Sequence, residues 1–201
     1  MADELADLTF RDEDWYGKEF GAEHYLRCRF TDLDLTEARS RGTVFEDCEF
    51  SNCRFNASEH TDTAFIGCDI RRTSWFDASL IGCKLTGTVF VECVLQPLTV
   101  SGGGTWSSVV LRGAELAGAD LSGVRLNDAD LSEADLRGAI LRGCDLSQAT
   151  VRGADLREAD LRGATLANVD LTTARLSETR LDLAGAVALA ESAGATVEIE
   201  P

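Results

Sequence analysis

Seven cysteines and two histidines are the residues of this chain with the widest chemistry. Thiolates bind soft metals, form disulfides or act as nucleophiles, and imidazole carries protons near neutral pH. The first six cysteines are separated only by multiples of five residues, which is not the close pairing of a zinc site, and their total is odd. The residues concerned are Cys28, Cys48, Cys53, Cys68, Cys83, Cys93 and Cys144, with His24 and His60.

The spacing of the cysteines follows a repeat of five residues that runs along most of the chain. A bulky apolar residue, here termed the centre, returns every fifth position: aromatic in the first half, as at Phe10, Trp15 and Phe20, and nearly always leucine from Leu111 to Leu181. A period of five is neither the 3.6 of a helix nor the 2.0 of a strand. The repeat itself must therefore be the structural unit.

Every cysteine lies two residues before a centre. Cysteine is among the most often buried residue types and packs as a small hydrophobic side chain. We therefore predict that this column of small residues points inward beside the centres. A metal site and a disulfide framework are not expected, and reduced, buried thiols favour a cytoplasmic protein.

Two centres are polar, Ser40 and His60, and they are twenty residues apart. They predict either a hydrogen-bonded pair or a hydrated part of the surface. No nucleophile, base and orienting group are arranged as a catalytic set, and no phosphate-binding loop is present. The sequence therefore predicts a protein that is not an enzyme and needs no cofactor.

The chain is strongly acidic, with 35 acidic against 19 basic residues and a net charge of −16. The excess is spread along its length, because residues 1–100 carry a net charge of −9 and residues 101–201 carry −7. Contacts to phosphate need clustered Lys and Arg, so direct binding to nucleic acid or to an anionic membrane is not expected. The sequence offers neither an N-terminal signal-type segment nor an apolar run long enough to span a bilayer.

The repeat shifts by one residue near the middle of the chain. Centres fall on multiples of five as far as Val100 and one position later from Trp106 onward. One extra residue within Ser101–Thr105, where three glycines follow one another, accounts for the shift. Pro97, which lacks an N–H, suits a corner just before it. We favour a tolerated irregularity over the alternative, a short loop that contacts a partner.

The repeat ends near Leu181 and a different pattern follows. Asp182 is a suitable N-cap and Gly194 a suitable residue to end a helix. The predicted division is a repeat domain over 1–182, with a register break near 96–106, and a capping or dimerisation helix with its tail over 183–201. Thr196–Ile199 alternates as a short strand would. The residues predicted to mediate dimerisation are Leu183, Ala186, Val187 and Ala190.

Stretches such as GADLREADLRGATL resemble the pentapeptide repeat family, and the resemblance covers roughly residues 8–181. It implies an all-β fold, a right-handed quadrilateral parallel β-helix with four pentapeptides in each coil, followed here by a short C-terminal α-helix. Three segments are similar to the fluoroquinolone-resistance members of the family, the mycobacterial protein and, more loosely, the Qnr proteins: FRDED, GTVFVECVLQPLT and RLDLAGAVALAESAG. In the mycobacterial relative the terminal helix forms a head-to-head dimer. The long Qnr-type loop is absent here.

The residue before each centre should point outward, and in the second half it is usually acidic. Asp at this position also has a local role, because its carboxylate can accept hydrogen bonds from turn N–H groups. A narrow acidic rod has the charge sign and shape of duplex DNA. With the resemblance, this predicts a DNA mimic that binds DNA gyrase, inhibiting it or protecting it from fluoroquinolones or other gyrase poisons. The alternative is an acidic scaffold without gyrase affinity. The predicted contact residues are Glu115, Asp120, Asp130, Asp135, Asp145, Asp155, Asp160 and Asp170.

Overall fold

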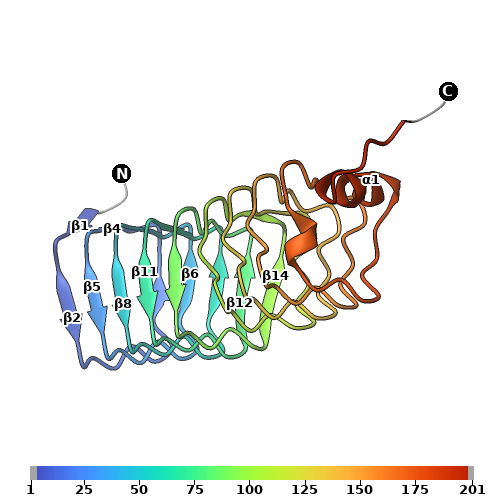
Figure 1. Cartoon of the computed structure of the whole chain (residues 1–201). Coiled ribbons are helices and arrows are strands. Elements are labelled where there is room, and N and C mark those ends of the chain that lie inside the picture. Colours follow the sequence, from blue (N-terminus) through green and yellow to red (C-terminus); the bar gives the residue numbers. More distant parts are fainter. Residues whose placement is uncertain (1–3, 199–201) are drawn as a thin grey trace.

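The chain forms one long tube of stacked rectangular coils, with an α-helix across its C-terminal end (Figure 1). The computed structural model describes residues 4–198. Strands pair in parallel, each with the segment twenty residues further on, so that Phe10 lies beside Phe30 and Phe30 beside Phe50. This is the right-handed quadrilateral β-helix that the family resemblance implies.

Strands line three of the four sides of the first half. One side holds β1 (Glu4–Ala6), β4 (His24–Leu26), β7 (Val44–Glu46) and β10 (Ala64–Ile66). The next holds β2 (Thr9–Arg11), β5 (Arg29–Thr31), β8 (Glu49–Ser51), β11 (Asp69–Arg71) and β13 (Val89–Val91). A third holds β3 (Glu19–Phe20), β6 (Arg39–Arg41), β9 (Glu59–Thr61), β12 (Ala78–Ile81) and β14 (Leu98–Ser101).

The fourth side, and most of the second half, is held by isolated parallel bridges rather than by extended strands. The exceptions in the second half are the short pair β15 (Gly104–Thr105) and β16 (Val124–Arg125) and the 3₁₀ turn η1 (Leu171–Thr173). The coil begins at Glu4 among the described residues, a few positions before the start near residue 8 that the repeat pattern predicts.

The five-residue unit folds in this way because two of its positions face inward and one turns the corner. The centre and the residue two before it are buried throughout most of the coil. The second residue after each centre generally has a positive φ, such as 52° at Asp12 and 55° at Asn52. Asp, Asn and Gly tolerate this left-handed conformation best, which explains why they are frequent in that column.

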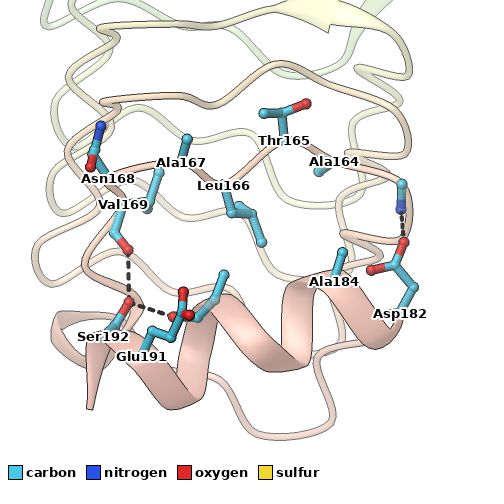
Figure 2. A pocket seen from close by; sticks show the side chains of 12 residues that line it. Ala164, Thr165, Leu166, Ala167, Asn168, Val169, Asp182, Ala184, Glu191 and Ser192 are labelled. Atoms are coloured by element: carbon cyan, nitrogen blue, oxygen red, sulfur yellow. Dashed lines mark hydrogen bonds between the residues drawn. The ribbon is translucent and has the colours of Figure 1, made fainter. Parts of the chain in front are cut away.

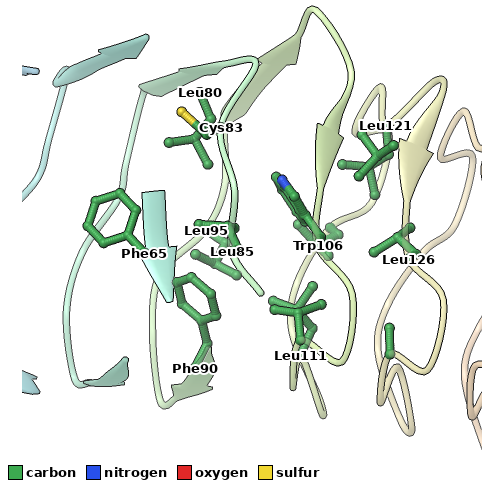
Figure 3. Packing of buried hydrophobic residues seen from close by; sticks show 14 of the residues in the cluster. Phe65, Leu80, Cys83, Leu85, Phe90, Leu95, Trp106, Leu111, Leu121 and Leu126 are labelled. Carbon is green, nitrogen blue, oxygen red and sulfur yellow. The ribbon is translucent and has the colours of Figure 1, made fainter. Parts of the chain in front are cut away.

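Stacked side chains fill the tube, and their size changes along it. In the first half the rings of Phe30 and Phe50 stack at 4.5 Å and those of Phe55 and Trp75 at 4.2 Å. In the second half leucines replace the aromatic residues (Figure 3). Where the two halves meet, Trp75 and Trp106 line a small void among apolar side chains.

The cysteines point inward, as their position in the repeat predicts. Six of them are buried and Cys93 is half-buried, and all seven are free thiols. Their Sγ atoms donate to main-chain oxygens of the preceding coil, as Cys68 does to Phe45 at 3.3 Å. Burial raises the pKa of Cys53, Cys83 and Cys144 to about 11. These thiols are therefore protonated at neutral pH and serve as packing groups.

Ser40 and His60 meet in the core and form a closed hydrogen-bond chain. Ser58 Oγ donates to the main-chain oxygen of Phe55, so it accepts from His60 Nε2 at 3.0 Å. The proton of the imidazole is thereby assigned to Nε2, and Nδ1 accepts from Ser40 Oγ at 2.6 Å. Thr63 Oγ1 lies 2.6 Å from Ser40 Oγ and 3.2 Å from the main-chain oxygen of Thr61, so its one hydroxyl hydrogen is shared between these two acceptors. Of the two expectations, the hydrogen-bonded pair is confirmed and the hydrated surface is wrong, because His60 is only 1% exposed.

This buried histidine predicts that the tube loses stability in mild acid. Burial lowers the pKa of His60 to about 3, whereas an unfolded histidine has a pKa of about 6.5. Below pH 6.5 the unfolded chain therefore binds the extra proton, and the free energy of unfolding falls as the pH falls, by about 1.4 kcal/mol per pH unit from this group. Above pH 6.5 the contribution is fully present.

The measurement is urea unfolding of the wild type and of His60→Leu between pH 7 and pH 4.5, a range above the titration of most carboxylates. The difference in unfolding free energy between the two proteins should change with pH at the slope given above. Parallel curves for the two proteins would contradict a neutral, buried His60.

The extra residue of the repeat lies in the glycine run. Ile81 pairs with Ser101, twenty residues on, whereas Lys84 pairs with Thr105, twenty-one residues on. Gly104 has a φ of 153°, and a Cβ atom there would lie 2.6 Å from the main-chain oxygen of Cys83. Glycine is therefore required at this position, because the contacted atom belongs to the backbone and cannot rotate away.

Just before the extra residue the ladder between two coils is open. Among residues 4–198, no backbone hydrogen bond and no bridge joins the segment 92–102 to the segment 112–122, although Val89 pairs with Val110 on one side and Gly104 with Val124 on another. The regular pattern would have the N–H of residue 97 donate to the oxygen of Ala117, and Pro97 has no N–H. The side-chain amide of Gln96 donates to that oxygen instead.

The helix α1 (Leu183–Ser192) closes the C-terminal end of the tube (Figure 1). Asp182 is its N-cap and accepts from the N–H of Gly185 at 2.9 Å, and Gly194 follows with a φ of 86°. Beyond the helix, residues 195–198 form no strand, and Ile199 lies outside the described residues. The short strand predicted at Thr196–Ile199 is therefore not formed at residues 196–198, which pair with no other described segment.

Candidate acidic interaction surface

The four sides of the tube carry unequal charge. We define the acidic face as the side formed by residues 13–17, 33–37, 53–57, 73–77, 93–97, 114–118, 134–138, 154–158 and 174–178, which lie above one another along the tube. It carries ten acidic and four basic residues, a net charge of −6. The acidic residues are Glu13, Asp14, Asp34, Glu37, Asp77, Glu115, Asp135, Asp155, Glu158 and Glu178.

The adjoining side, here called the neutral face, has no net charge. It comprises residues 18–22, 38–42, 58–62, 78–82 and 98–102, which contain β3, β6, β9, β12 and β14, with the stacked segments 119–123, 139–143, 159–163 and 179–182, and it holds six acidic and six basic residues. The sides that contain β1 and β2 carry net charges of −4 and −2 over the described residues, so the acidic face is the most negative of the four sides and not the only negative one. Summing the formal charges of residues that are twenty positions apart would have shown this difference between the sides from the sequence alone.

The structure distributes the eight predicted contact residues over all four sides. Glu115, Asp135 and Asp155 form the expected ladder, with bridges from Glu115 to Asp135 and from Asp135 to Asp155. Asp120 and Asp160 lie on the neutral face. The remaining three lie on the other two sides, Asp130 and Asp170 beyond β13 and Asp145 beyond β16. The eight residues are thus not one continuous surface, and only the ladder belongs to the acidic face.

Three of the eight carboxylates are neutralised by the arginine two residues later. The Arg157 side chain donates to both carboxylate oxygens of Asp155, from Nε at 2.8 Å and from a terminal nitrogen at 2.6 Å. The main-chain N–H of Arg157 also donates to this carboxylate. The same fork joins Arg137 to Asp135 and Arg162 to Asp160. The hydrogen bonds from Arg157 hold the pKa of Asp155 at about 2, and those from Arg162 hold the pKa of Asp160 well below its usual range.

The same two carboxylates are also the least accessible, since Asp155 and Asp160 are each 9% exposed. The tripeptide Asp-Leu-Arg, at 135–137, 155–157 and 160–162, indicates this pairing in the sequence, whereas a count of charges does not. Where Ser or Thr follows instead, as at Asp120, Asp145 and Asp170, the carboxylate accepts from the turn N–H and from a hydroxyl. The local role expected of Asp is confirmed.

Several acids of the acidic face have no cation within 4 Å among the described residues. They are Glu13, Asp14, Glu37, Asp77, Glu115, Glu158 and Glu178. Two of them hold local structure, because Glu13 accepts from Trp15 Nε1 at 2.8 Å and Asp14 from the Tyr16 N–H at 3.0 Å. The exposed, unpaired carboxylates that remain give the face its field.

The end of the tube presents a second surface, made by α1 and the last coil. The helix covers Leu166 and Val169, and Ser192 Oγ donates to the main-chain oxygen of Val169 at 3.0 Å (Figure 2). An open groove of about 640 Å³ runs between the helix and the coil. Of the predicted dimerisation residues, Leu183 is 74% exposed, Ala186 is exposed, and Val187 and Ala190 are half-buried.

Residues 4–198 contain no group of three or more His, Cys, Asp or Glu side chains that could bind a metal ion. No described helix has the length and apolar character to cross a bilayer.

These features define a class, a parallel β-solenoid of five-residue units with a net negative charge. Residues 107–148 and 139–178 match the family model for pentapeptide repeats. The chain thus contains a segment of pentapeptide repeats in its second half. No curated protein matches the chain.

Solved structures of QnrB1, a plasmid-mediated fluoroquinolone resistance protein, are similar in fold. One trypsin-treated variant has a TM-score of 0.85 at 21% identity, with 98% of each chain covered. The full-length form has a TM-score of 0.54 at 22% identity, covering 96% of this chain and all of the other.

Proposed function

We propose that this protein is a DNA mimic that binds DNA gyrase through its acidic face. The observation that carries the proposal is the row of exposed carboxylates along the acidic face, the most negative of the four sides of the rod. Ladder residues repeat every ~4.8 Å along that side, and duplex DNA carries one charge per ~1.7 Å of its axis. The charge density is lower than that of DNA, but its sign and linear arrangement suit a basic groove that normally holds DNA.

The fold similarity to a fluoroquinolone resistance protein supports gyrase as the partner. Occupation of the DNA-binding saddle would inhibit supercoiling, and it would protect the enzyme by displacing DNA from drug-stabilised cleavage complexes. Because the attraction is between exposed charges, added salt should weaken it. The proposed function involves no catalytic step, and the protein acts by binding in the cytoplasm.

The test is gyrase supercoiling at increasing concentrations of this protein, repeated over a series of salt concentrations. The proposal expects inhibition whose half-maximal concentration rises steeply with salt. A companion assay measures drug-induced cleavage complexes, which should decrease as the protein is added. Absence of inhibition at low salt would leave an acidic scaffold without gyrase affinity as the better description.

We further propose that α1 forms a homodimer through the side that faces away from the coil. Ala188, Leu189 and Ser192 face the tube, which leaves the exposed Leu183 beside Ala186 for a second copy. A dimer would place two acidic rods end to end and lengthen the DNA-like surface.

The dimer predicts that Leu183→Glu is monomeric by light scattering while it keeps the circular dichroism spectrum of the wild type. The reason is that two carboxylates would face each other across the two-fold axis. Leu8→Glu, at the opposite end of the tube, is the matched control and should leave the mass unchanged. A variant at residue 183 that remains dimeric would refute this interface.

A further inference from the structure

The acidic face is interrupted near its middle by apolar side chains. Val94 takes the outward ladder position and is 50% exposed, and Phe76, on the preceding coil, is 52% exposed. Pro97 is exposed at the corner beside them. We call Phe76, Val94 and Pro97 the apolar island. Large exposed apolar groups gathered on one side of a soluble protein commonly mark a contact surface.

The island lies where the ladder is open. An open groove of about 350 Å³ starts at Pro97 and is lined by Gln96, Leu98, Ala117, Gly118 and Ala119. Small residues border it on the far side, so an inserted side chain could approach the backbone closely. The Gln96 amide, which donates to the Ala117 oxygen, spans one end of the groove. The space thus adjoins the island and is held open by the absent backbone ladder.

Unpaired acids flank the island along the tube. Glu37 lies two coils before Phe76, Asp77 is its immediate neighbour, and Glu115 lies on the coil after Val94. With a rise of ~4.8 Å per coil, charged groups lie within about 10 Å on either side. A surface complementary to this pattern has basic groups to either side of an apolar one. DNA presents a uniform row of phosphates to the same surface and has no apolar group at the position of the island.

We propose that the island and its groove anchor one apolar side chain of the partner, set between basic side chains of the same surface. This inference rests on the proposed function and refines it, because the partner remains the basic saddle of gyrase. On this account the acids steer the encounter and the island provides short-range specificity. The protein would then be more than a copy of DNA, since it would use a contact that DNA lacks.

The experiment exploits a difference in sign. Val94→Glu fills the gap in the acidic ladder, so purely electrostatic mimicry expects tighter binding. An apolar anchor expects weaker binding, because the new carboxylate would be desolvated against an apolar group, by about tenfold in Kd at moderate salt. Ile81→Glu adds the same charge at a 40% exposed aliphatic residue off the acidic face, on the same coil as Phe76, and should change Kd less than about twofold.

A second variant, Phe76→Ser, removes apolar surface without adding charge. It should weaken binding about fivefold while the slope of log Kd against log salt stays that of the wild type. Melting temperatures equal to the wild type confirm that the variants are folded. Tighter binding by Val94→Glu, or no effect of Phe76→Ser, overturns the anchor but leaves gyrase binding intact. If the wild type itself does not bind gyrase, the proposed function fails, and this inference fails with it.

Discussion

Replacing Phe50 by alanine is expected to lower the free energy of unfolding by about 3–5 kcal/mol. The ring is 1% exposed and stacks on Phe30 at 4.5 Å with an interplanar angle of 7°. It also meets Phe45 edge-on at 5.4 Å and Phe55 at 5.6 Å. The cavity would be surrounded by side chains whose positions are fixed by coils on both sides, so little collapse can fill it.

Urea unfolding followed by circular dichroism measures this loss, at fixed protein concentration so that any dimer contributes equally. Phe76→Ala is the matched control, because it removes the same ring from the surface and should cost less than about 0.5 kcal/mol. A loss at Phe50 as small as that of the control would mean that the aromatic column is not the continuous core described above.

Reversing three unpaired acids of the acidic face is expected to weaken gyrase binding about 100-fold at low salt. The variant is Glu37→Lys, Asp77→Lys and Glu115→Lys, all exposed and without an ion-pair partner among the described residues. Each change replaces attraction by repulsion at the same place, and the effect should shrink as salt screens it. Titration of gyrase with labelled protein at several salt concentrations gives the affinities.

The control reverses three acids of the neutral face, Glu59, Asp62 and Asp120, and changes the net charge by the same amount. Two of the three positions are matched between the two variants. Asp77 and Asp62 both occupy left-handed corners. Glu115 and Asp120 both precede a centre. We expect a loss of at most about tenfold for this control. Equal losses in the two variants would show that total charge, rather than one side of the rod, governs binding.

Much of the fold could be predicted from the sequence because the repeat leaves few arrangements open. A period of five with every cysteine in one column identifies the two inward positions, and the spacing of twenty brings Ser40 to His60. The glycine run identifies the place where a residue is inserted. The rest of the polar network could not be predicted. It also needs Ser58, which bonds to His60, and Thr63, which bonds to Ser40, and both lie in the column two residues before a centre, which is usually apolar or small.

The candidate surface could be predicted less well, because formal charges do not show how charges pair. The arginine forks at Asp135, Asp155 and Asp160 remove carboxylates that a count treats as free. The open ladder depends on a donor that Pro97 lacks, together with the register shift a few residues later, and neither feature alone implies a groove. Both differences arise from side-chain and backbone hydrogen bonds that a pattern of apolar residues does not encode.

Competition between this protein and duplex DNA for gyrase tests the central claim most directly. Labelled protein is bound to gyrase, and a linear duplex long enough to fill the saddle is added at constant salt. Mutually exclusive binding predicts that the apparent Kd of the protein rises in proportion to the concentration of free duplex, with no plateau. A plateau, or a complex that contains gyrase, duplex in the saddle and this protein together, would contradict DNA mimicry.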